Sequence, residues 1–357
     1  MCDTLARVGP DGTIFAKNSD RPRDEVQLLV WSPGRPAGGE MRTQYLTLPD
    51  PGAHGVLLSQ PTWLWGAEHG VNEHGVAIGN ERVYARRSLD DEPALIGMDL
   101  VRLGLERGAT ADEALAAMVE LLEAHGQGGS CRQDTNDPYD SSFLITDAHG
   151  GWVLETCGRS WAAMPIGAGT SISNRYSIGD SWTRASADVP AGTSTHDWHD
   201  DRVDLRRADH RLAATRSCVA HTDGLDPATA VSALRDHGRG RWGRPGTADH
   251  PHPPPTEAGD DFSGFTVCMH GDWAATTTAS MVVSLPRAGA PTVWACAGSP
   301  CVGTYRRIDD LAAPPAELTD ADAWKRAAAR RDAVEQDPGR LAAIAAGRVD
   351  DERAAFA

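Results

Sequence analysis

The sequence has 357 residues, of which 40% are hydrophobic and 24% charged, as in ordinary soluble globular proteins, and its length suggests roughly two or three domains. The formal net charge of −16 disfavours nucleic acid and anionic membranes as partners, because an acidic surface repels both. No apolar stretch approaches the ~20 residues that span a bilayer, and no signal peptide is recognisable at the N-terminus. The seven cysteines are scattered and odd in number, so no disulfide framework is expected. These features predict a reduced, cytoplasmic protein.

Periodicity and turn residues predict a sequence of strands interrupted by helices. The first two strands form a hairpin through the turn "GPDG". Strands are predicted, in chain order, at residues 2–8, 13–18, 26–31, 75–79, 142–147, 151–157, 160–166, 170–174, 264–270, 280–285 and 292–298. Helices are predicted from near Ile96, over 114–126, over 200–217, from Pro227, and twice after Asp320.

Boundary signals support this assignment. Thr110 and Glu113 have the spacing of a capping box ahead of a helix. Residues 239–261 are rich in Pro and Gly and lack a hydrophobic period, which predicts a loop. Asp337-Pro338-Gly339 separates the last two helices. The order of strands and helices predicts layered α+β architecture instead of strict βαβ alternation.

A cysteine directly after the initiator methionine raises a chemical possibility. A thiol attacks as thiolate and needs a base. If Met1 is removed, Cys2 carries an α-amine with a reference pKa of about 7.7–8.0, which can accept the thiol proton and return it to a leaving group. Cysteine is small enough for aminopeptidase removal of Met1 to be expected. Cys2 is therefore a candidate N-terminal nucleophile.

The hairpin supplies a candidate anchor for that amine. In an antiparallel pairing through "GPDG", residues near Asn18 to Asp20 return beside Cys2. A buried carboxylate there would hold a terminal amine, which predicts that role for Asp20. The alternative is that Cys2 belongs to a frayed terminus and Asp20 to a surface turn.

Several segments, taken together, resemble the secernin family and its bacterial dipeptidase relatives, which are N-terminal nucleophile hydrolases. In order along the chain they are "MCDT", "FAKNSDRP", "PTWLWGAEHGVNEHGVAIGNERV", "GGWVLETCG", "SISNRYSIGD", "TVCMHGDW" and "TTTASMVVSL". The pattern more distantly resembles penicillin V acylases and bile salt hydrolases. The resemblance implies an α+β fold, an αββα sandwich of two antiparallel sheets between helix layers. We assign it to residues 2–305, with 306–357 as a C-terminal helical extension.

The resemblance also implies roles for individual residues. Cys2 matches the nucleophile, Asp20 the carboxylate that binds the amine, and Asn174 the asparagine of the oxyanion hole. Asn80 is expected to polarise the substrate carbonyl, and Arg82 on the same strand face is expected to bind a substrate carboxylate.

Other positions are less closely determined. Lys17 stands where the acylases have arginine, and lysine cannot form the bidentate fork of a guanidinium. Lys17 and Asn18 are nevertheless expected to contact substrate. A later arginine of the acylases falls on Arg202 or Arg206, and the sequence does not choose between them.

Two histidine and cysteine patterns were weighed as metal sites. His196 and His199 are three residues apart with acids nearby, but the stretch is loop-like and lacks further ligands, so a solvated loop is expected. Cys296 and Cys301 have a spacing unlike that of zinc motifs, which favours buried or turn thiols. We therefore expect no metal and no cofactor.

Cys268 and His270 form a possible thiol–imidazole pair, because alternation along a strand would place both on one face. No papain-like motif surrounds Cys268, so a structural role is favoured. His69 and His74 lack the His-Glu-X-X-His spacing of zinc proteases and are expected in a loop before a strand.

Together these patterns predict a cysteine N-terminal nucleophile amidohydrolase that forms a thioester on Cys2, with a small peptide or amide as its partner. A dipeptidase is the first expectation. An acylase of non-peptide amides and a non-catalytic, secernin-like binding module are the alternatives. Nucleic acid and membranes are not expected as partners, and the oligomeric state is left open.

Overall fold

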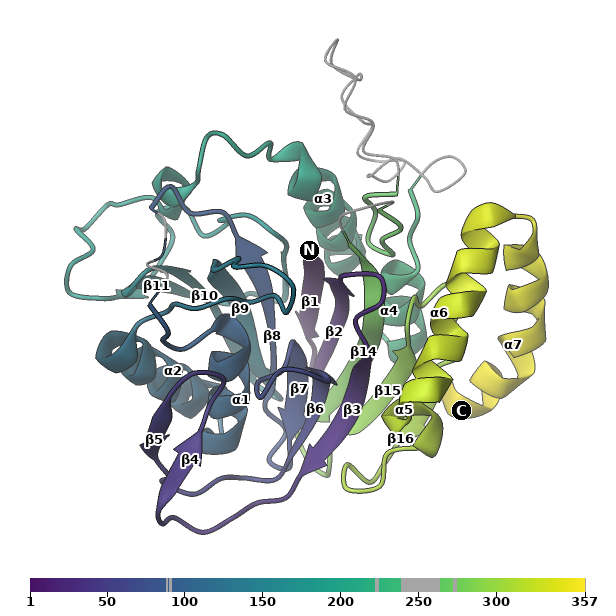
Figure 1. Ribbon diagram of the computed structural model, residues 1–357, viewed down its shortest axis with the longest axis horizontal. Helices are drawn as coiled ribbons and strands as arrows, with labels where there is room; N and C mark the ends of the chain where they lie inside the picture. Colours follow the sequence, from purple (N-terminus) through teal and green to yellow (C-terminus); the bar gives the residue numbers. More distant parts are fainter. Residues whose placement is uncertain (88, 90–91, 222–224, 239–263, 272–274, 357) are drawn as a thin grey trace.

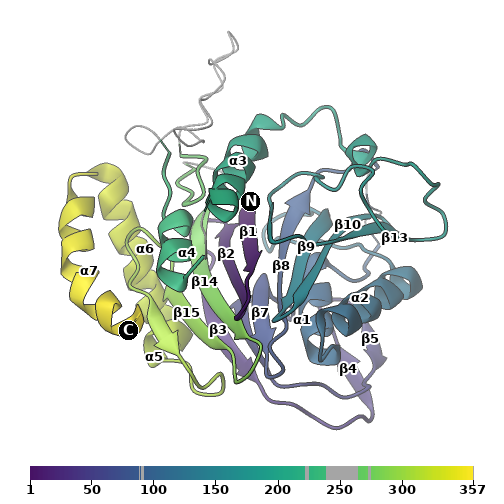
Figure 2. The ribbon, with the colours of Figure 1, turned by 180° about the vertical axis from the view of Figure 1, so that it is seen from behind.

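The computed structural model describes residues 1–87, 89, 92–221, 225–238, 264–271 and 275–356. Two antiparallel sheets are stacked on each other, and helices pack against their outer faces (Figures 1 and 2). The predicted α+β sandwich of two antiparallel sheets between helix layers is confirmed. The loop predicted at 239–261 lies outside the described residues.

The six-stranded sheet contains the N-terminal strand. Its order is β12–β1–β2–β14–β15–β16, with every pairing antiparallel. The strands are β1 (Cys2–Val8), β2 (Gly12–Arg21), β12 (Gly169–Ile172), β14 (Thr276–Pro286), β15 (Thr292–Ala297) and β16 (Arg306–Ile308). Cys2 lies opposite Ser19, so the predicted hairpin returns Asp20 to the start of β1. The register of β14 shifts between Thr277 and Ala279, where that strand passes Asp20.

The second sheet has eight strands in the order β13–β11–β10–β9–β8–β7–β6–β3. They are β3 (Gln27–Ser32), β6 (Val56–Pro61), β7 (His69–Asn72), β8 (Ala77–Val83), β9 (Asp140–Asp147), β10 (Gly150–Cys157), β11 (Ser160–Pro165) and β13 (Arg184–Ala185). A separate small hairpin pairs β4 (Glu40–Arg42) with β5 (Thr47–Pro49).

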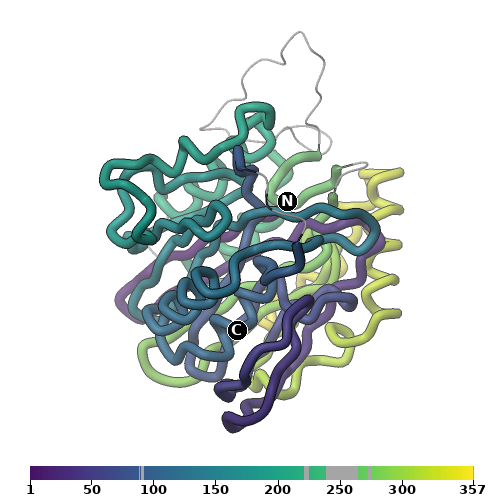
Figure 3. The backbone as a smooth tube through the Cα atoms, turned by 60° about the vertical axis from the view of Figure 1, so that its left-hand side comes forward, coloured from purple at the N-terminus to yellow at the C-terminus, as the bar shows by residue number. Residues whose placement is uncertain are grey.

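Helices α1 (Gly97–Arg107) and α2 (Ala111–His125) cover the eight-stranded sheet. Helices α3 (Arg206–His221) and α4 (Pro227–Leu234) cover the six-stranded sheet near β1, β2 and β12. The C-terminal helices α5 (Ala316–Thr319), α6 (Ala321–Gln336) and α7 (Arg340–Phe356) run along one side of the molecule (Figure 3). A short 3₁₀ helix spans Thr195–Trp198.

The core has three layers that follow from side-chain alternation along the strands. Phe15 and Met281 from one sheet meet Leu57 and Leu144 from the other between the sheets. Neighbouring residues such as Ala16 point to the opposite face, toward α3 and α4. Because β1 and β2 are covered on both faces, the start of β1 is held in a fixed position rather than frayed.

All of the predicted helices are present, with shifted ends. Thr110 caps α2 by accepting from the backbone N–H of Glu113, as its spacing indicated. Helix α3 begins at Arg206, six residues after the predicted start, and the last two helices are interrupted at the predicted position.

Residues 264–270 were predicted to form a strand, and this prediction is wrong. The segment folds back on itself, with the backbone N–H of His270 donating to the carbonyl of Gly264 at 2.8 Å. Gly264 has φ +84°, a conformation that L side chains rarely adopt. The segment joins β14 through a single bridge between His270 and Thr276.

Residues 306–357, expected as a helical extension, begin with β16 at the edge of the six-stranded sheet before helices α5 to α7. Among the described residues, no helix has the length and apolar character needed to cross a membrane.

Candidate active site

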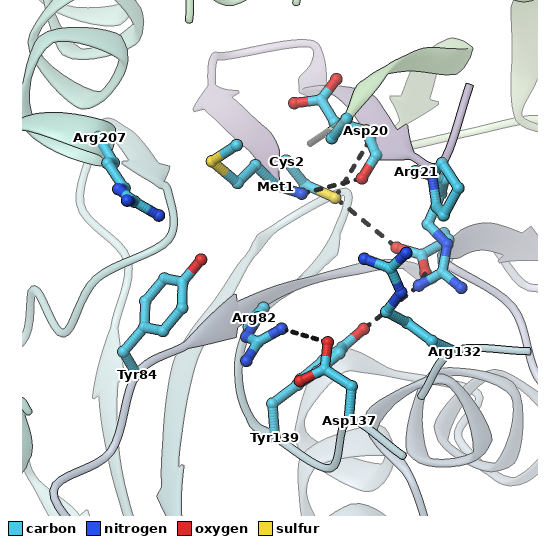
Figure 4. Close-up of a pocket in the computed structure, with 13 residues that line it drawn as sticks. Met1, Cys2, Asp20, Arg21, Arg82, Tyr84, Arg132, Asp137, Tyr139 and Arg207 are labelled. Carbon is cyan, nitrogen blue, oxygen red and sulfur yellow. Dashed lines mark hydrogen bonds and ion pairs between the residues drawn. The ribbon is translucent and has the colours of Figure 1, made fainter. Parts of the chain in front are cut away.

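A pocket of about 460 Å³ opens at the N-terminal end of β1 (Figure 4). Its walls come from the ends of β2 and β8, from the connection between α2 and β9, and from α3 and the start of β14. The lining residues are Met1, Cys2, Asp20, Arg21, Pro22, Glu68, Arg82, Tyr84, Arg132, Asp137, Tyr139, Arg207 and Ala275. Residues far apart in sequence thus meet around the second residue of the chain.

Cys2 lies in the wall of this pocket and is only 4% exposed. Its backbone N–H donates to Oδ1 of Asn174 at 2.9 Å, and its thiol donates to Oε2 of Glu68 at 3.7 Å. The backbone N–H of Asp20 points at the sulfur from 3.5 Å. Burial raises the pKa of the Cys2 thiol to about 11, although Lys17 and the N-terminal amine act in the opposite direction. The thiol is therefore protonated at neutral pH while Met1 is present.

Arg211 on α3 fixes the backbone around Cys2. Its guanidinium is fully buried and donates to the carbonyl oxygen of Cys2 at 3.0 Å and to the carboxylate of Asp3 at 2.6 Å. It also donates to Oδ1 of Asn174 at 2.6 Å. Asn174 in turn donates through Nδ2 to the carbonyl of Arg82 at 2.9 Å. Because an amide nitrogen has two N–H groups, Asn174 retains one further donor.

Asp20 lies next to the N-terminus (Figure 4). Its Oδ1 accepts from the hydroxyl of Thr277 at 2.7 Å, and its Oδ2 is 3.9 Å from Nη1 of Arg211. Its backbone carbonyl accepts from the amine of Met1 at 2.8 Å. Burial raises the pKa of the Asp20 carboxyl to about 6, while the N-terminal ammonium and Arg211 favour its ionised form.

Glu68 is the acid closest to the sulfur, and it is held by a cation. Oε1 of Glu68 lies 3.1 Å from Nη1 of Arg21, and both side chains are buried. Arg21 also pairs with Glu25, at 2.6 Å. A carboxylate with a fixed counter-ion can orient the thiol by accepting its hydrogen bond.

Guanidinium groups line the rest of the pocket. Arg82 pairs with Asp137 at 2.6 Å and lies over the rings of Tyr84 and Tyr139, 4.8 and 4.9 Å from their centroids. Within the part of the chain that the structure describes, the guanidinium of Arg207 makes no hydrogen bond or ion pair. The pocket therefore offers Arg207 as a cation for an anionic group of a ligand.

Lys17 was expected to contact substrate, but it lies between the sheets and has no exposed surface. Its Nζ donates to the carbonyl of Asn80 at 2.6 Å and to Oε1 of Glu81 at 3.3 Å. A Cβ at Gly79 would come within 2.5 Å of Cδ of Lys17, so the lysine stem needs a glycine there. Burial acts to lower the pKa of Lys17, but Cys2 and Glu81 more than offset it and raise the pKa above its ordinary value. Lys17 can thus influence Cys2 only as a nearby positive charge.

The structure does not bring Asn18 or Asn80 into the pocket. Asn18 points to the helix side of its sheet and donates to the carbonyls of Leu234 and Val267, each at 2.8 Å. Asn80 shares a strand face with Arg82, as alternation predicted. It lies deeper, however, beneath α1, where Nδ2 contacts Sδ of Met98 at 3.6 Å.

Neither arginine proposed from the sequence lines the pocket. Arg202 is exposed and pairs with Asp200, and Arg206 pairs with Asp204. The arginines that do approach Cys2 from this region are Arg207 and Arg211, which are one turn apart on α3.

The remaining histidines and cysteines lie outside the pocket. His199 contacts the carbonyl of Val203 at 3.0 Å, and the described residues place no third ligand beside it and His196. His69 lies on β7, not in the predicted loop, and is fully buried. Cys268 and His270 are close to each other, as predicted, but neither lines the pocket.

Sequence reasoning missed Glu68, Arg207 and Arg211. Glu68 lies within the segment "WGAEHG", where nothing in the residue spacing distinguishes it from a surface acid. A signal for Arg211 existed, since it shares a helical face with Ala208 and Thr215, both of which are buried. A charged residue on the apolar face of a helix indicates a buried ion pair.

No sequence profile of a known protein family matches the chain. Among solved structures, it is similar to the C2A mutant of conjugated bile acid hydrolase from Clostridium perfringens, with 12% identity and a TM-score of 0.48 over 88% of this chain and 95% of that one. It is also similar to penicillin V acylase from Agrobacterium tumefaciens, with 14% identity and a TM-score of 0.48 over 87% and 86%. A Caenorhabditis elegans orthologue of N-acylethanolamine-hydrolyzing acid amidase gives 11% identity and a TM-score of 0.39 over 79% and 92%. At these values the similarities assign no activity to this chain.

Proposed function

We propose that the protein is a cysteine amidohydrolase that uses Cys2 as an N-terminal nucleophile after removal of Met1, and that it cleaves dipeptides. The observation that supports this most directly is the position of Cys2. Its sulfur lines a pocket, its nitrogen is held by Asn174, and Asp20 lies beside the terminus.

Removal of Met1 turns the backbone nitrogen of Cys2 into an α-amine. This amine keeps Oδ1 of Asn174 as a hydrogen-bond acceptor and gains the adjacent carboxylate of Asp20 as a counter-charge. While Met1 is present, the Cys2 thiol has a pKa of about 11 and supplies little thiolate at neutral pH. Catalysis therefore requires transfer of the thiol proton during attack, and the α-amine on the same residue is the base within reach.

The reaction follows in two halves. The Cys2 sulfur forms a bond to the substrate carbonyl carbon as its proton passes to the α-amine, and the carbonyl electrons move to oxygen. When the tetrahedral intermediate collapses, the C–N bond breaks, the α-amine returns the proton to the leaving nitrogen, and a thioester remains. Water then attacks the thioester carbonyl as the α-amine takes a proton from it, and the C–S bond breaks as the ammonium returns that proton to sulfur, which releases the acid and restores the thiol.

Asn174 is suited to stabilise the negative oxygen of these intermediates. Its Oδ1 is held by Cys2 and Arg211, and one N–H of Nδ2 is held by the carbonyl of Arg82. The second N–H of Nδ2 is left for the substrate oxygen. Removing one such donor from an oxyanion hole costs about 10²–10³ in kcat in well-studied hydrolases.

The charges of the pocket favour a small substrate with a free carboxylate. The volume of about 460 Å³ falls within the ~300–1,000 Å³ of small-ligand pockets. Arg207 and Arg82 both line the pocket, and the guanidinium of Arg207 is available to a ligand. A dipeptide would place its carboxylate near these arginines. The many charged side chains are a poor environment for a long acyl chain.

The test begins with the intact mass of the purified protein, which should be lower than that of the full sequence by one methionine. The protein should then hydrolyse unblocked dipeptides faster than N-acyl amino acids. Cys2→Ser should retain a trace of activity and Cys2→Ala none, because alanine keeps the amine and loses the nucleophile. Cys218→Ala is the matched control, since Cys218 is partly exposed and lies outside the pocket.

Three outcomes would redirect the proposal. Full activity in protein that retains Met1 would exclude the α-amine as base. A preference for N-acyl amino acids would favour the acylase alternative. A wild-type protein that binds these compounds without hydrolysing any of them would favour a binding module.

A further inference from the structure

A second cluster of reactive side chains lies outside the pocket, where three parts of the chain meet. His237 follows α4, Cys268 and His270 precede β14, and Cys301 follows β15 (elements labelled in Figure 1). One ligand atom from each of these four residues lies within 4.8 Å of all the others. Two sulfurs and two imidazole nitrogens therefore lie close together in one cluster.

The distances within this cluster match those between the ligands of a zinc ion. Nε2 of His270 is 3.6 Å from Sγ of Cys268 and 3.4 Å from Sγ of Cys301. For tetrahedral coordination with Zn–S of about 2.3 Å and Zn–N of about 2.0–2.1 Å, sulfur and nitrogen ligands lie roughly 3.6 Å apart. The rings of His237 and His270 have centroids 5.1 Å apart, and one nitrogen of each ring lies within 4.8 Å of the other ligand atoms.

Glu335 on α6 supports this arrangement from behind. Its Oε1 lies 2.8 Å from Nδ1 of His270. A hydrogen bond from Nδ1–H to this carboxylate fixes the tautomer, so that Nε2 presents its lone pair to the sulfurs. Metal-binding histidines almost always have such a partner on their second nitrogen. A simple contact between thiols and an imidazole does not require it.

Most of the cluster is also buried, as is typical of structural metal sites. Cys268 has no exposed surface, and Cys301 and His270 are 2% and 3% exposed. His237 is partly exposed, but the other three residues are buried, which argues against Cys268 and His270 as a catalytic thiol–imidazole pair open to substrate. A structural site has all four positions filled by protein ligands and none left for water.

We propose that His237, Cys268, His270 and Cys301 bind one structural zinc ion. The sequence spacing gave no indication of it, because the ligands come from three distant segments and only Cys268 and His270 are close in sequence. Binding requires both sulfurs as thiolates, so any protons that the ligands carry are released to solvent, and no oxidation or reduction is involved.

Such an ion would hold in place the segment beside the N-terminus. The backbone N–H of Met269 donates to Oγ1 of Thr277 at 2.9 Å, and Thr277 donates to Asp20. Met1 packs against Phe265, Met269 and Ala275. The zinc site would therefore fix the segment of 264–271 that supports Asp20, although it does not depend on the proposed hydrolase activity.

The first experiment measures metal by mass spectrometry in the full-length protein, purified without chelator and with thiols kept reduced. About one zinc ion per chain is expected, as for a Cys2His2 site. Protein stripped of metal and titrated with Co²⁺ should develop thiolate-to-cobalt charge-transfer bands and the visible bands of tetrahedral cobalt. Cys301→Ser and His270→Asn should lose the stoichiometric zinc. Cys296→Ser, a buried cysteine outside the cluster, should keep it.

A second pair of variants tests the supporting carboxylate without removing a ligand. Glu335→Gln should weaken zinc affinity about 10–100-fold, as changes next to a metal-bound histidine do. Asp332→Asn is the control, because Asp332 shares the contact with Arg23 but does not touch His270. Competition with a chromogenic chelator measures both affinities.

The proposal is overturned if folded wild-type protein contains no stoichiometric metal and takes up neither Zn²⁺ nor Co²⁺. It is equally overturned by a disulfide between Cys268 and Cys301 in freshly purified protein, detected by non-reducing peptide mapping. Equal loss of zinc in Cys296→Ser and Cys301→Ser would place the metal elsewhere.

Discussion

Nη2 of Arg211 donates to Oδ1 of Asn174 at 2.6 Å, and the same oxygen accepts the backbone N–H of Cys2 at 2.9 Å. The arginine thus fixes which way the amide of Asn174 is turned, with its oxygen toward Cys2 and its nitrogen toward the carbonyl of Arg82. Two residues that are far apart in sequence determine the orientation of one donor. This arrangement makes Arg211 a positioning residue for the proposed oxyanion hole.

Arg211→Met should destabilise the protein strongly. The substitution keeps the length and apolar stem of the side chain but leaves the buried carboxylate of Asp3 without its cation. Removing one partner of a buried ion pair typically costs about 3–5 kcal/mol of unfolding free energy. Urea unfolding measures the change. Arg202→Met, at an exposed arginine, should stay within ~0.5 kcal/mol of wild type, and an equal loss in the two variants would contradict this account.

Asp20→Asn should lower kcat and shift the pH profile. An adjacent carboxylate stabilises the ammonium form of the Cys2 amine and so raises the amine pKa. With asparagine the amine pKa falls, by about 1 unit for the loss of a close opposite charge. The acid limb of kcat/KM should therefore move to lower pH even as the maximal rate drops. Steady-state rates across pH 5–9 measure both effects, and Thr277→Val, which removes only the hydrogen bond to Asp20, should give a smaller shift.

Glu68→Gln distinguishes two roles for the acid nearest the sulfur. The carboxylate raises the thiol pKa, so its removal should lower that pKa and leave Arg21 as an additional favourable charge. Alkylation of Cys2 at pH 7 should then become faster than in wild type. If Glu68 is instead the base that accepts the thiol proton, alkylation and hydrolysis should both become slower.

The fold followed from the sequence wherever local signals agreed with tertiary structure. "GPDG" predicted the hairpin and therefore the proximity of Asp20 to Cys2, because both lie within one local pairing. The strand predicted at residues 264–270 was wrong, because the apolar residues of this segment pack around Met269 in a loop. A short apolar run does not by itself distinguish a strand from a buried turn.

The site could be predicted from the sequence only in part. The alternation of side chains along a strand predicts which face of the sheet a residue lies on, but not whether it reaches the pocket. It placed Asn80 and Arg82 on one side of β8, yet only Arg82 reaches the pocket. Arg211 could have been recognised as a buried charge from the helical face that it shares with Ala208 and Thr215. Its partners could not, because they depend on how α3 packs against β1 and β12, which no local pattern specifies.

Asp99 provides a test of burial through the pH dependence of stability. Burial raises the pKa of its carboxyl to about 7, although the backbone N–H groups of Ile96 and Gln44 favour the ionised form. Because the folded-state pKa lies above the unfolded value, the folded state binds more protons between about pH 4 and 7. The contribution of Asp99 to the unfolding free energy is therefore fully present below pH 4 and is lost as the pH rises through 7. Asp99→Asn should gain stability relative to wild type between pH 5 and pH 8 in denaturant unfolding. If the difference in unfolding free energy between Asp99→Asn and wild type is the same at pH 5 and pH 8, Asp99 stays ionised over this range.

Arg207 gives the most direct test of the proposed substrate class. Arg207 lines the pocket, and its guanidinium makes no hydrogen bond or ion pair with a carboxylate among the described residues, so it is available to the carboxylate of a substrate. Arg207→Met should therefore raise KM for unblocked dipeptides while changing kcat little, since it removes binding that is equal in the ground state and transition state. A hydrogen bond to a charged group contributes about 1.5–3 kcal/mol, which predicts a rise in KM of roughly 10–150-fold.

The matched measurement uses the same dipeptide with its C-terminus amidated. Wild type should bind the amide poorly, and Arg207→Met should bind acid and amide alike, because the cation that distinguishes a carboxylate from an amide is then absent. Arg206→Met is the control on the neighbouring residue, whose guanidinium already pairs with Asp204 and lies outside the pocket. If Arg207→Met raises KM equally for acid and amide, the arginine contributes to the shape of the pocket but does not bind the substrate carboxylate. If wild type prefers the amide, the free carboxylate is not part of the substrate, and Arg82 with its partner Asp137 becomes the side of the pocket to examine.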